Sequence, residues 1–506
     1  MPLSSRKRWY RYERAGIVTQ CNDFSGIGKD GVALQRRTRI VATLGPATDR
    51  PGVPESLLES GLDVARINFA HGSVAELKAR IARLRALADP LPRPIAVLLD
   101  LPGPKLRVVL DSPLSLGAGQ DVTLATGPAA TGQIRVTEPE ALAQLKPNQR
   151  VLMDDGRLQF RVRSTTKDTV ALQVISGGTL MPNKGINLPD TELAIPAVTP
   201  RDRAALALAA SASVDWLGLS FVRSAGDAQE LRDVARTFGL RLPILAKIER
   251  PEAIEHAQAI IEAFDGIMVA RGDLGVEIDL ENVPHVQKRL INLARAAAKP
   301  VITATDMLDS MRVNPRPTRA EASDVANAVY DGTGAVMLSG ETAAGQYPIE
   351  AFQMMDRIVR QAEAHFPEDP LRDLPIGGGI EDHISRLTCN LARDIHADAI
   401  ITPAFSGRTA RLVSRHRPRI PIVVPVAQET VYRQMARVWA LEAVRMKDRL
   451  TASDRLEKVV EAAFQAEAVR AGALVVVLAG HPIEGGERFP TIRVVRVGPS
   501  GECVEP

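Results

Sequence analysis

The sequence predicts an α/β protein built on a closed parallel (β/α)8 TIM barrel, with an inserted small β-barrel lid domain and a C-terminal α/β domain. Three observations favour this fold class. Eight short apolar runs alternate with amphipathic stretches, a β-rich segment separates the third run from the fourth, and further apolar runs begin after residue 378. Eight strand-then-helix units are typical of a closed parallel barrel.

The barrel strands are predicted from short β-branched or apolar runs, each followed by a stretch with helical periodicity. Connecting stretches such as 53–61 end in Gly, a frequent helix terminator. We expect strands at 39–44, 64–69, 95–100, 216–221, 244–249, 266–271, 301–306 and 335–340. They place the barrel catalytic domain at residues 36–104 and 197–370.

Two other domains follow from the spacing of the runs. Residues 105–196 hold short alternating pieces divided by Gly, Asp and Pro, which indicates a small β domain in a loop at the barrel mouth, where it can act as a lid. Apolar runs at 398–404, 420–427, 474–480 and 492–498 predict a C-terminal α/β domain of the effector type over 378–506.

Composition limits the partners of this 506-residue chain. Hydrophobic residues make up 45% and charged residues 24%, as in soluble globular proteins, and no apolar stretch reaches the roughly 18–20 residues of a membrane helix. The net charge of +3 is concentrated in residues 1–39, which hold nine basic and three acidic residues. The remainder is slightly acidic, so we expect neither a nucleic acid nor a membrane as partner.

The cysteines and the N-terminal segment give two further expectations. Cys21, Cys389 and Cys503 are odd in number and far apart, which fits a reducing, cytoplasmic setting and predicts no disulfide framework. Residues 1–35 are basic and lack periodicity, so we expect a disordered N-terminal extension or a misplaced start codon. An arm for a membrane or a nucleic acid is the alternative.

Polar residues end the predicted strands, where barrels of this type hold their active sites. Glu249 and Asp273 end neighbouring strands, and their carboxylates are the hard ligands that Mg²⁺ prefers. Lys247 shares a face with Glu249 and needs an anionic partner, such as a phosphoryl group or an enolate oxygen. If a helix starts at Asp273, the N–H groups of Gly272 and Asp273 can bind a carboxylate, with Thr305 alongside.

Residues 65–72, "ARINFAHG", add a second strand end. Arg66 and Asn68 alternate and should share a face, and an Arg fork suits a phosphate. By itself an Arg-x-Asn pair is more often structural, and "RGDLG" at 271–275 is often a plain strand–turn–helix junction. The whole set, however, predicts a site for a phosphorylated acid.

Several stretches, taken in order, resemble those of pyruvate kinases. They are "RRTRIVATLGPAT", "ARINFAHG", "AKIER", "GIMVARGDLGVEI", "ATDML" and, close to diagnostic, "PRPTRAEASDVANAVYDGTGAVMLSGETAAGQYP" at 315–348. The resemblance covers residue 36 to the C-terminus. It implies a barrel with a lid and an effector domain, and Mg²⁺-dependent phosphoryl transfer from phosphoenolpyruvate to ADP, giving pyruvate and ATP at the last step of glycolysis. It also implies a cytoplasmic homotetramer.

Matching motifs carry the family's roles to individual residues. The resemblance implies catalytic roles for Lys247, Thr305 and Arg66, and substrate contacts from Arg66, Lys247, Gly272, Asp273 and Thr305. It implies that Glu249 and Asp273 hold Mg²⁺, with Mn²⁺ as an alternative ion, and that Asn68, His71, Arg107 and Lys184 face the nucleotide.

An effector site is expected at 404–411, "AFSGRTAR", which follows a predicted strand and precedes a helix. Ser406, Gly407, Arg408 and Thr409 can form a phosphate nest. The resemblance implies a phosphorylated allosteric effector there, and a plain helix N-cap is the alternative.

Residues 100–107, "DLPGPKLR", depart from the commoner family pattern. Many pyruvate kinases have Glu at the position of Lys105 and bind K⁺ nearby, whereas members with Lys there dispense with K⁺. The resemblance therefore implies that Lys105 replaces K⁺ in a region that includes Asn68 and Asp100. We interpret Asp100 and Lys105 as two halves of one electrostatic device, with a solvated hinge lysine as the alternative.

Two other functions stay open. One is another Mg²⁺-dependent barrel enzyme acting on an enolpyruvate-type acid, which would lack the lid and the C-terminal domain. The other is a catalytically silent homologue that only binds metabolites, against which the complete set of Lys247, Glu249, Asp273 and Arg66 argues.

Overall fold

The computed structural model describes residues 36–125, 133–366, 379–446, 455–482 and 488–506. Eight parallel strands close into a barrel in the order β1-β17-β16-β15-β14-β13-β3-β2. They are β1 (Arg39–Leu44), β2 (Val64–Asn68), β3 (Ala96–Leu101), β13 (Trp216–Leu219), β14 (Ile244–Ile248), β15 (Gly266–Ala270), β16 (Val301–Ala304) and β17 (Ala335–Leu338). All eight predicted barrel strands are confirmed. The run predicted to extend to 306 ends at Ala304, because Thr305 and Asp306 turn the chain with φ values of 67° and 54°.

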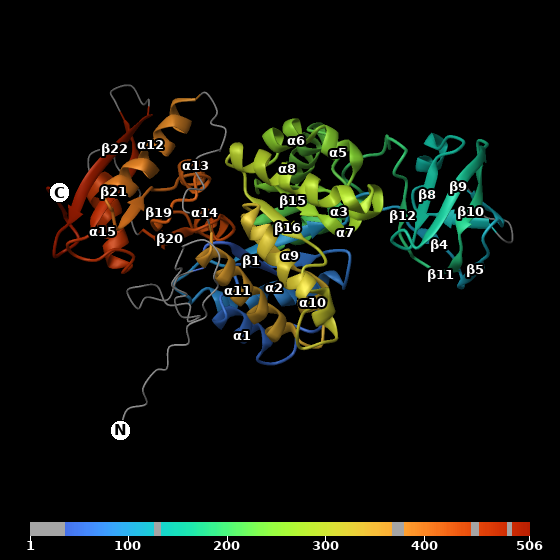
Figure 1. Cartoon of the computed structure of the whole chain (residues 1–506), viewed down its shortest axis with the longest axis horizontal. Coiled ribbons are helices and arrows are strands. Elements are labelled where there is room, and N and C mark those ends of the chain that lie inside the picture. Colours follow the sequence, from blue (N-terminus) through green and yellow to red (C-terminus); the bar gives the residue numbers. More distant parts are fainter. Residues whose placement is uncertain (1–35, 126–132, 367–378, 447–454, 483–487) are drawn as a thin grey trace, which may run out of the picture. The chain divides into compact units, whose positions relative to one another are not determined.

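Helices surround the barrel strands, as Figure 1 shows. Alternation along the strands divides the core: Ile40 and Ala42 of β1 pack with the helices, whereas Val41 joins the cluster inside the barrel. The helices are α1 (Val53–Glu59), α2 (Val74–Ala88), α3 (Pro200–Ser211), α4 (Gly226–Thr237), α5 (Pro251–Glu255), α6 (Ala257–Ala263), α7 (Arg271–Glu277), α8 (Val283–Ala296), α9 (Arg319–Tyr330), α10 (Gly340–Ala343) and α11 (Pro348–Ala364).

The inserted segment is a mixed sheet that curls toward closure. Its strand order is β12-β8-β9-β10-β6-β7-β4, beside a two-stranded sheet β11-β5. The edge strands meet at a bridge between Arg107 and Gly185, so the sheet approaches the expected small barrel. The strands are β4 (Val108–Val109), β5 (Leu114–Leu116), β6 (Asp121–Ala125), β7 (Gln133–Val136), β8 (Arg150–Met153), β9 (Leu158–Thr165), β10 (Thr169–Ser176), β11 (Gly178–Leu180) and β12 (Ile186–Asn187).

The C-terminal domain is a six-stranded sheet between helices. Its order is β20-β19-β18-β21-β22-β23. Ile400 and Ile422 pack with residues of α12, α13 and α14, while Ile401 and Val423 pack with residues of α15, so helices cover both faces. The elements are β18 (Ala399–Ile401), β19 (Ile422–Val426), β20 (Leu441–Arg445), β21 (Leu474–Pro482), β22 (Arg488–Val497), β23 (Cys503–Val504), α12 (Ile380–Asp394), α13 (Arg408–Ser414), α14 (Glu429–Met435) and α15 (Arg455–Gln465).

The structure confirms the predicted fold class. The domain boundaries stay predictions, and the expected extension over 1–35 lies outside the described residues. In the part of the chain that the structure describes, no helix combines the length and apolarity needed to span a membrane.

Candidate active site

A buried charged network occupies the C-terminal ends of β2, β3 and β14. The Lys247 Nζ lies 2.7 Å from Ser220 Oγ, 3.0 Å from Glu249 Oε1 and 3.3 Å from Asp100 Oδ1. The Arg66 Nε donates to Asp100 Oδ2 at 2.8 Å, so Asp100 accepts from both cations. Their side chains are almost entirely buried, and they have the face and the mouth position that the alternation predicted.

The network keeps its charges because its members compensate one another. Burial alone would raise the pKa of Asp100, but Lys247 and Arg66 hold it below its usual range. Burial alone would lower the pKa of Lys247, but Asp100 and Glu249 raise it above its usual value. The Lys247 ammonium is therefore protonated at neutral pH and fixed beside the site where an anion would enter.

Glu249 and Asp273 form an acidic pair that fits a divalent ion. The Phe221 N–H donates to Glu249 Oε2 at 2.8 Å, and this donor is aimed by an unusual φ of 57° at Phe221. Oε1 is buried and accepts no hydrogen bond from the described residues, although it has an ion-pair contact with Lys247. Burial, with a further contribution from the Asp273 charge, raises the pKa of Glu249. A cation between the two carboxylates would relieve their mutual repulsion.

The donor set favours a hard ion that keeps other ligands. Within the described residues no group of three His, Cys, Asp or Glu side chains could hold a metal. Two carboxylates leave room for water and substrate oxygens, which is the coordination that Mg²⁺ prefers. Glu249 and Asp273 therefore fit Mg²⁺ better than a transition metal such as Zn²⁺, which takes nitrogen and sulfur ligands.

Lys105 contacts Asp273 and not Asp100. Its Nζ lies 2.7 Å from Asp273 Oδ1 and 5.6 Å from the centroid of the Phe221 ring. Asp100 is held instead by Arg66 and Lys247. Asp100 and Lys105 therefore do not pair directly, and the interpretation of the two as halves of one electrostatic device stays a prediction. The side chain of Lys105 is only 23% exposed, so the alternative of a freely solvated hinge lysine is excluded.

The predicted carboxylate-binding turn is formed, with one correction. Helix α7 begins at Arg271, two residues before the expected Asp273. The Gly272 N–H donates to Thr305 Oγ1 at 2.6 Å, so these two residues meet as predicted, but this N–H is already bonded within the protein. Arg271 donates to the Thr305 carbonyl at 2.7 Å and to Asp324 at 2.7 Å, which supports the left-handed backbone of Thr305.

The residues expected to face a nucleotide come from two parts of the chain: Asn68 and His71 from the barrel, and Arg107 and Lys184 from the inserted segment. Asn68 Oδ1 accepts from the Ala70 N–H at 3.0 Å, and His71 is exposed. Partial burial, with Arg107 and Arg66, lowers the pKa of His71. Arg107 Nη1 donates to the Asn183 carbonyl at 3.0 Å, and Lys184 Nζ lies 2.7 Å from Asp154 Oδ1. His71 therefore lies in the positive field of Arg107, while Lys184 is held within the inserted sheet.

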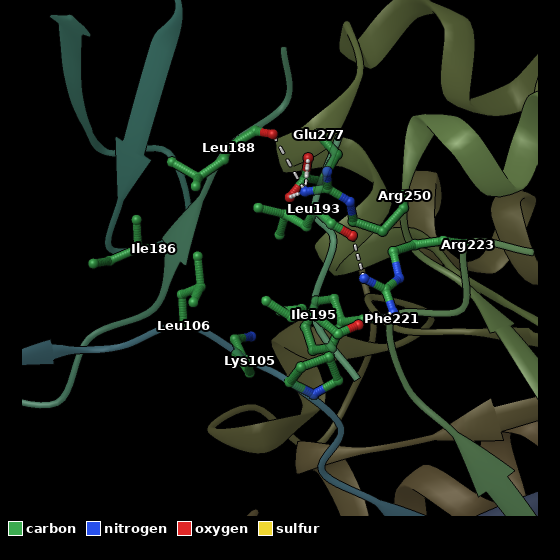
Figure 2. Close-up of a pocket in the computed structure, with 11 residues that line it drawn as sticks. Lys105, Leu106, Ile186, Leu188, Leu193, Ile195, Phe221, Arg223, Arg250 and Glu277 are labelled. Atoms are coloured by element: carbon green, nitrogen blue, oxygen red, sulfur yellow. Dashed lines mark hydrogen bonds and ion pairs between the residues drawn. The ribbon is translucent and has the colours of Figure 1, made fainter. Parts of the chain in front are cut away.

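A cavity lies between the inserted sheet and the barrel, as Figure 2 shows. It has an empty volume of about 340 Å³, is largely apolar, and shares Lys105 with the charged centre. Arg250 and Glu277 close its far side, 3.1 Å apart, and Asn187 Nδ2 donates to Glu277 Oε1 at 2.8 Å. The cavity therefore lies between Lys105, where the chain enters the inserted segment, and the buried ion pair of Arg250 with Glu277.

The expected effector loop keeps an open N-terminus. Gly407 precedes α13 with φ of 74°, and no side chain caps the helix, which argues against the alternative of a plain side-chain N-cap. Arg408 is 70% exposed and lies 2.8 Å from Glu381.

Comparisons with known proteins agree with this geometry. A family model described as "Pyruvate kinase, barrel domain" matches residues 35–352, and one described as "Pyruvate kinase, alpha/beta domain" matches 382–495. This chain belongs to the pyruvate kinase family. It is 39% identical over 460 residues to the pyruvate kinase of Geobacillus stearothermophilus, covering 89% of this chain and 78% of the relative. It is 40% identical over 471 residues to that of Mycobacterium tuberculosis H37Rv, covering 92% and 99%. With Synechocystis "Pyruvate kinase 2" it shares 42% identity over 475 residues, covering 92% and 80%.

In this member of the pyruvate kinase family, Ser220 accepts from Lys247 and donates to the Leu101 carbonyl at 2.7 Å, so this polar strand end reaches the site. Sequence reasoning omitted two residues of structural weight. Arg250 and Glu277 were missed because their pairing across the cavity is tertiary. No local pattern marks such a pair.

Proposed function

We propose that this chain transfers the phosphoryl group of phosphoenolpyruvate to ADP, giving pyruvate and ATP in glycolysis. The P–O bond to the enolate oxygen breaks, a P–O bond to the terminal phosphate of ADP forms, and the enolate takes a proton on its methylene carbon. Membership of the pyruvate kinase family supports this reaction. The observation that carries it is the Lys247 ammonium, buried and held by Glu249, Ser220 and Asp100 at the barrel mouth.

Lys247 acts on the charge that develops during the transfer. Its ammonium would neutralise negative charge on the enolate oxygen and the moving phosphoryl group. Arg66 would bind the phosphoryl oxygens with its fork, while Asp100 and Thr43 hold the guanidinium in place. Because these groups are fixed before the substrate arrives, they stabilise the transition state without reorganising.

Glu249 and Asp273 would hold Mg²⁺, or Mn²⁺ as an alternative. The buried Oε1 of Glu249, which contacts Lys247 but accepts no hydrogen bond from the described residues, supports this assignment. When bound, such an ion would supply positive charge to the phosphoryl oxygens. The two carboxylates would also fix the substrate near Lys247, and their mutual repulsion favours ion binding.

Gly272, Asp273 and Thr305 would bind the substrate carboxylate. The Gly272 N–H is now bonded to Thr305 Oγ1, so this bond would open or be shared when a carboxylate arrives. The freed Thr305 hydroxyl could then orient the water that protonates the enolate.

Asn68, His71, Arg107 and Lys184 would face ADP or ATP. The two cations suit its phosphates, and the lowered pKa of His71 keeps its imidazole neutral there.

Lys105 would replace the K⁺ ion that many family members require. Its ammonium lies 2.7 Å from Asp273 Oδ1, which puts a fixed positive charge next to a proposed metal ligand. We therefore expect full activity in buffer free of K⁺. A large activation by added K⁺ would refute this assignment.

One coupled assay tests the proposed reaction. Pyruvate formation from phosphoenolpyruvate and ADP would be followed through NADH oxidation by lactate dehydrogenase, with and without Mg²⁺. The expected result is Mg²⁺-dependent turnover. Binding of phosphoenolpyruvate without turnover would favour a silent homologue, and consumption without ADP would favour another barrel enzyme acting on the same acid.

Three further assignments stay proposals. Ser406, Gly407, Arg408 and Thr409 would bind a phosphorylated effector, and the open N-terminus of their loop supports an anion there. A homotetramer rests on the family alone, and a cytoplasmic location rests on the family and the cysteine usage.

A further inference from the structure

A basic cavity lies at the other end of the barrel, where the strands begin and the C-terminal domain packs. It has an empty volume of about 340 Å³. The barrel contributes residues between the end of α8 and the start of β16, and the C-terminal domain contributes α13 and the segments after it. Its lining includes no acidic residue and five basic ones: Arg295, Lys299, Arg411, Arg415 and Arg417.

These cations are poorly neutralised. Arg415 has a carboxylate partner, Asp382, at 2.7 Å. Lys299 donates to the Phe264 carbonyl at 2.6 Å, Arg411 to the Ser406 carbonyl at 3.1 Å, and Arg417 to the Thr333 carbonyl at 2.8 Å. In the described part of the chain, Arg415 is therefore alone among the five in having an ion pair.

Nearby acids are engaged elsewhere. Asp265 accepts from the Ile244 N–H at 2.9 Å and from Arg232 at 3.1 Å. Glu363 accepts from the N–H groups of Arg37, at 2.9 Å, and of Thr38. The cavity thus keeps an excess of positive charge inside the protein, which is costly unless an anion compensates it.

Two buried donors at the cavity lack an acceptor. The Arg295 Nε and the Trp439 Nε1 are buried and have no hydrogen-bond partner among the described residues. Trp439 is only 7% exposed, and its ring is fixed because Ser414 Oγ donates to its carbonyl at 2.7 Å and the Arg417 guanidinium stacks 4.4 Å from its centroid. Unsatisfied buried donors are rare in folded proteins and usually mark a missing partner.

Arg295 and Arg417 also act on each other. Burial lowers the pKa of Arg295, and burial together with the Arg295 charge lowers that of Arg417 well below its usual value. Both guanidinium groups approach Gly332: a Cβ built there would lie 2.7 Å from Arg295 Nη1, and Arg417 donates to the Gly332 carbonyl. Both groups are thus held near the same backbone turn, and neither has an ion pair with an acidic residue of the described chain.

We propose that this cavity is a binding site for a phosphate-class oxyanion, either free phosphate or the phosphoryl group of a small metabolite. Arg295, Arg417 and the Trp439 N–H would donate to it. Guanidinium forks match phosphate oxygens, and a doubly charged anion compensates more of the excess than a carboxylate does. This site is distinct from the 406–409 loop, because it lies at the C-terminal half of α13, where Arg411 and Ser414 face the cavity.

Binding there would join two domains, since the ligand contacts Arg295 on the barrel side and Arg417 and Trp439 on the other. The alternative is that the arginines only fasten the domains together through carbonyl contacts such as that of Arg417 to Thr333. Measurements with and without phosphate distinguish a binding site from a purely structural contact between the domains.

The test compares the full chain with three variants, by thermal unfolding and by equilibrium dialysis of radiolabelled inorganic phosphate, at constant ionic strength set with NaCl. Arg295→Gln removes one charged donor. Trp439→Phe keeps the ring and removes only the N–H, so it remains informative if Arg295→Gln fails to fold. Arg408→Gln is the control for the effector loop, whose side chain is exposed and outside the cavity.

Phosphate should raise the Tm of the parent saturably, on the order of a few degrees at about 100 times its Kd. Arg295→Gln and Trp439→Phe should each weaken phosphate binding at least about tenfold, while the phosphate response of Arg408→Gln stays equal to that of the parent. The basal kinase activity of folded Arg295→Gln and Trp439→Phe should stay unchanged. An equal phosphate response in the parent and in both cavity variants would overturn the proposal. So would loss of the response in Arg408→Gln alone, because it would assign the ion to the loop.

Two further ligands identify the source of the phosphoryl group. A hexose monophosphate and a nucleoside monophosphate would be titrated against the parent and Trp439→Phe. Tighter binding of either ester than of inorganic phosphate, lost in Trp439→Phe, would support a metabolite as the occupant. Equal or weaker binding of the esters, with phosphate binding still sensitive to the variant, would support free phosphate.

Discussion

Replacing Lys247 with Met tests the proposed role of this ammonium directly. In the resting site, Nζ lies 3.0 Å from Glu249 Oε1 and 3.3 Å from Asp100 Oδ1. At an effective dielectric constant of about 20, each contact corresponds to about 5 kcal/mol of Coulomb attraction before desolvation. If half of one such interaction is made only with the transition state, its loss costs about 2.7 kcal/mol, or roughly 100-fold in rate.

We therefore expect Lys247→Met to lower kcat by at least about 100-fold, a loss like that caused by removing an oxyanion-hole donor. Binding of phosphoenolpyruvate should stay nearly intact, because Arg66 and the Gly272 turn are unchanged and Met keeps the length of the side chain. Single-turnover kinetics would measure the chemical step, and isothermal titration in the presence of Mg²⁺ would measure binding.

The matched control is Lys288→Met, the same change at a lysine whose side chain is 53% exposed and pairs with the largely buried Asp331. It should leave kcat unchanged, since Lys288 lies on helix α8 and contacts none of the proposed site residues. Circular dichroism and thermal unfolding of both variants would separate lost chemistry from lost folding. A folded Lys247→Met variant with near-normal kcat would refute the assigned role.

Three other changes give separate expectations. Lys105→Gln should reduce activity in K⁺-free buffer and make the enzyme respond to added K⁺. A variant that keeps the parent activity without K⁺ and does not respond to added K⁺ would contradict the role of Lys105. Glu277→Gln removes the charge that pairs with the buried Arg250, so it should lower the free energy of unfolding, measured with urea, by about 3 kcal/mol. The control Glu429→Gln, at the more exposed pair with Arg433, should lower it by at most about 1 kcal/mol. Burial lowers the pKa of His416 to about 3, so its contribution to stability falls as pH drops below about 6.5, by about 2 kcal/mol at pH 5. His416→Asn should flatten this part of the pH–stability curve, and an unchanged curve would exclude the effect.

Most of the fold was predictable because local patterns decide it. Short, nearly continuous apolar runs mark β1 and the other barrel strands, because a strand of a closed parallel barrel is buried on both faces along its whole length. Strand β20, Leu441–Arg445, was missed because it is an edge strand interrupted by the partly buried Glu442 and ends in an exposed Arg. Such a segment does not differ from a loop by composition.

The candidate site was predictable where it follows from strand ends and unpredictable where it follows from contacts across the lid hinge. Lys247, Glu249 and Arg66 lie on two strands of known alternation, so their common face could be derived. The partner of Lys105 could not, because the residue follows a Pro-Gly-Pro turn whose exit direction no periodicity fixes. The pairing of Glu277 with Arg250 depends on tertiary contacts of the same kind.

The pairing of Lys105 with Asp273 changes the electrostatics of the whole centre. Asp100, Glu249 and Asp273 are matched by Arg66, Lys247 and Lys105, so the resting site is close to neutral. A highly charged phosphorylated acid entering a balanced, largely buried site would meet too little positive charge to offset its desolvation. The substrate therefore has to bring a cation with it or find one already bound, and Glu249 and Asp273 are the carboxylates proposed to hold that ion. It follows that affinity for phosphoenolpyruvate should depend steeply on Mg²⁺, while the monovalent cation, supplied by the chain itself, should not matter.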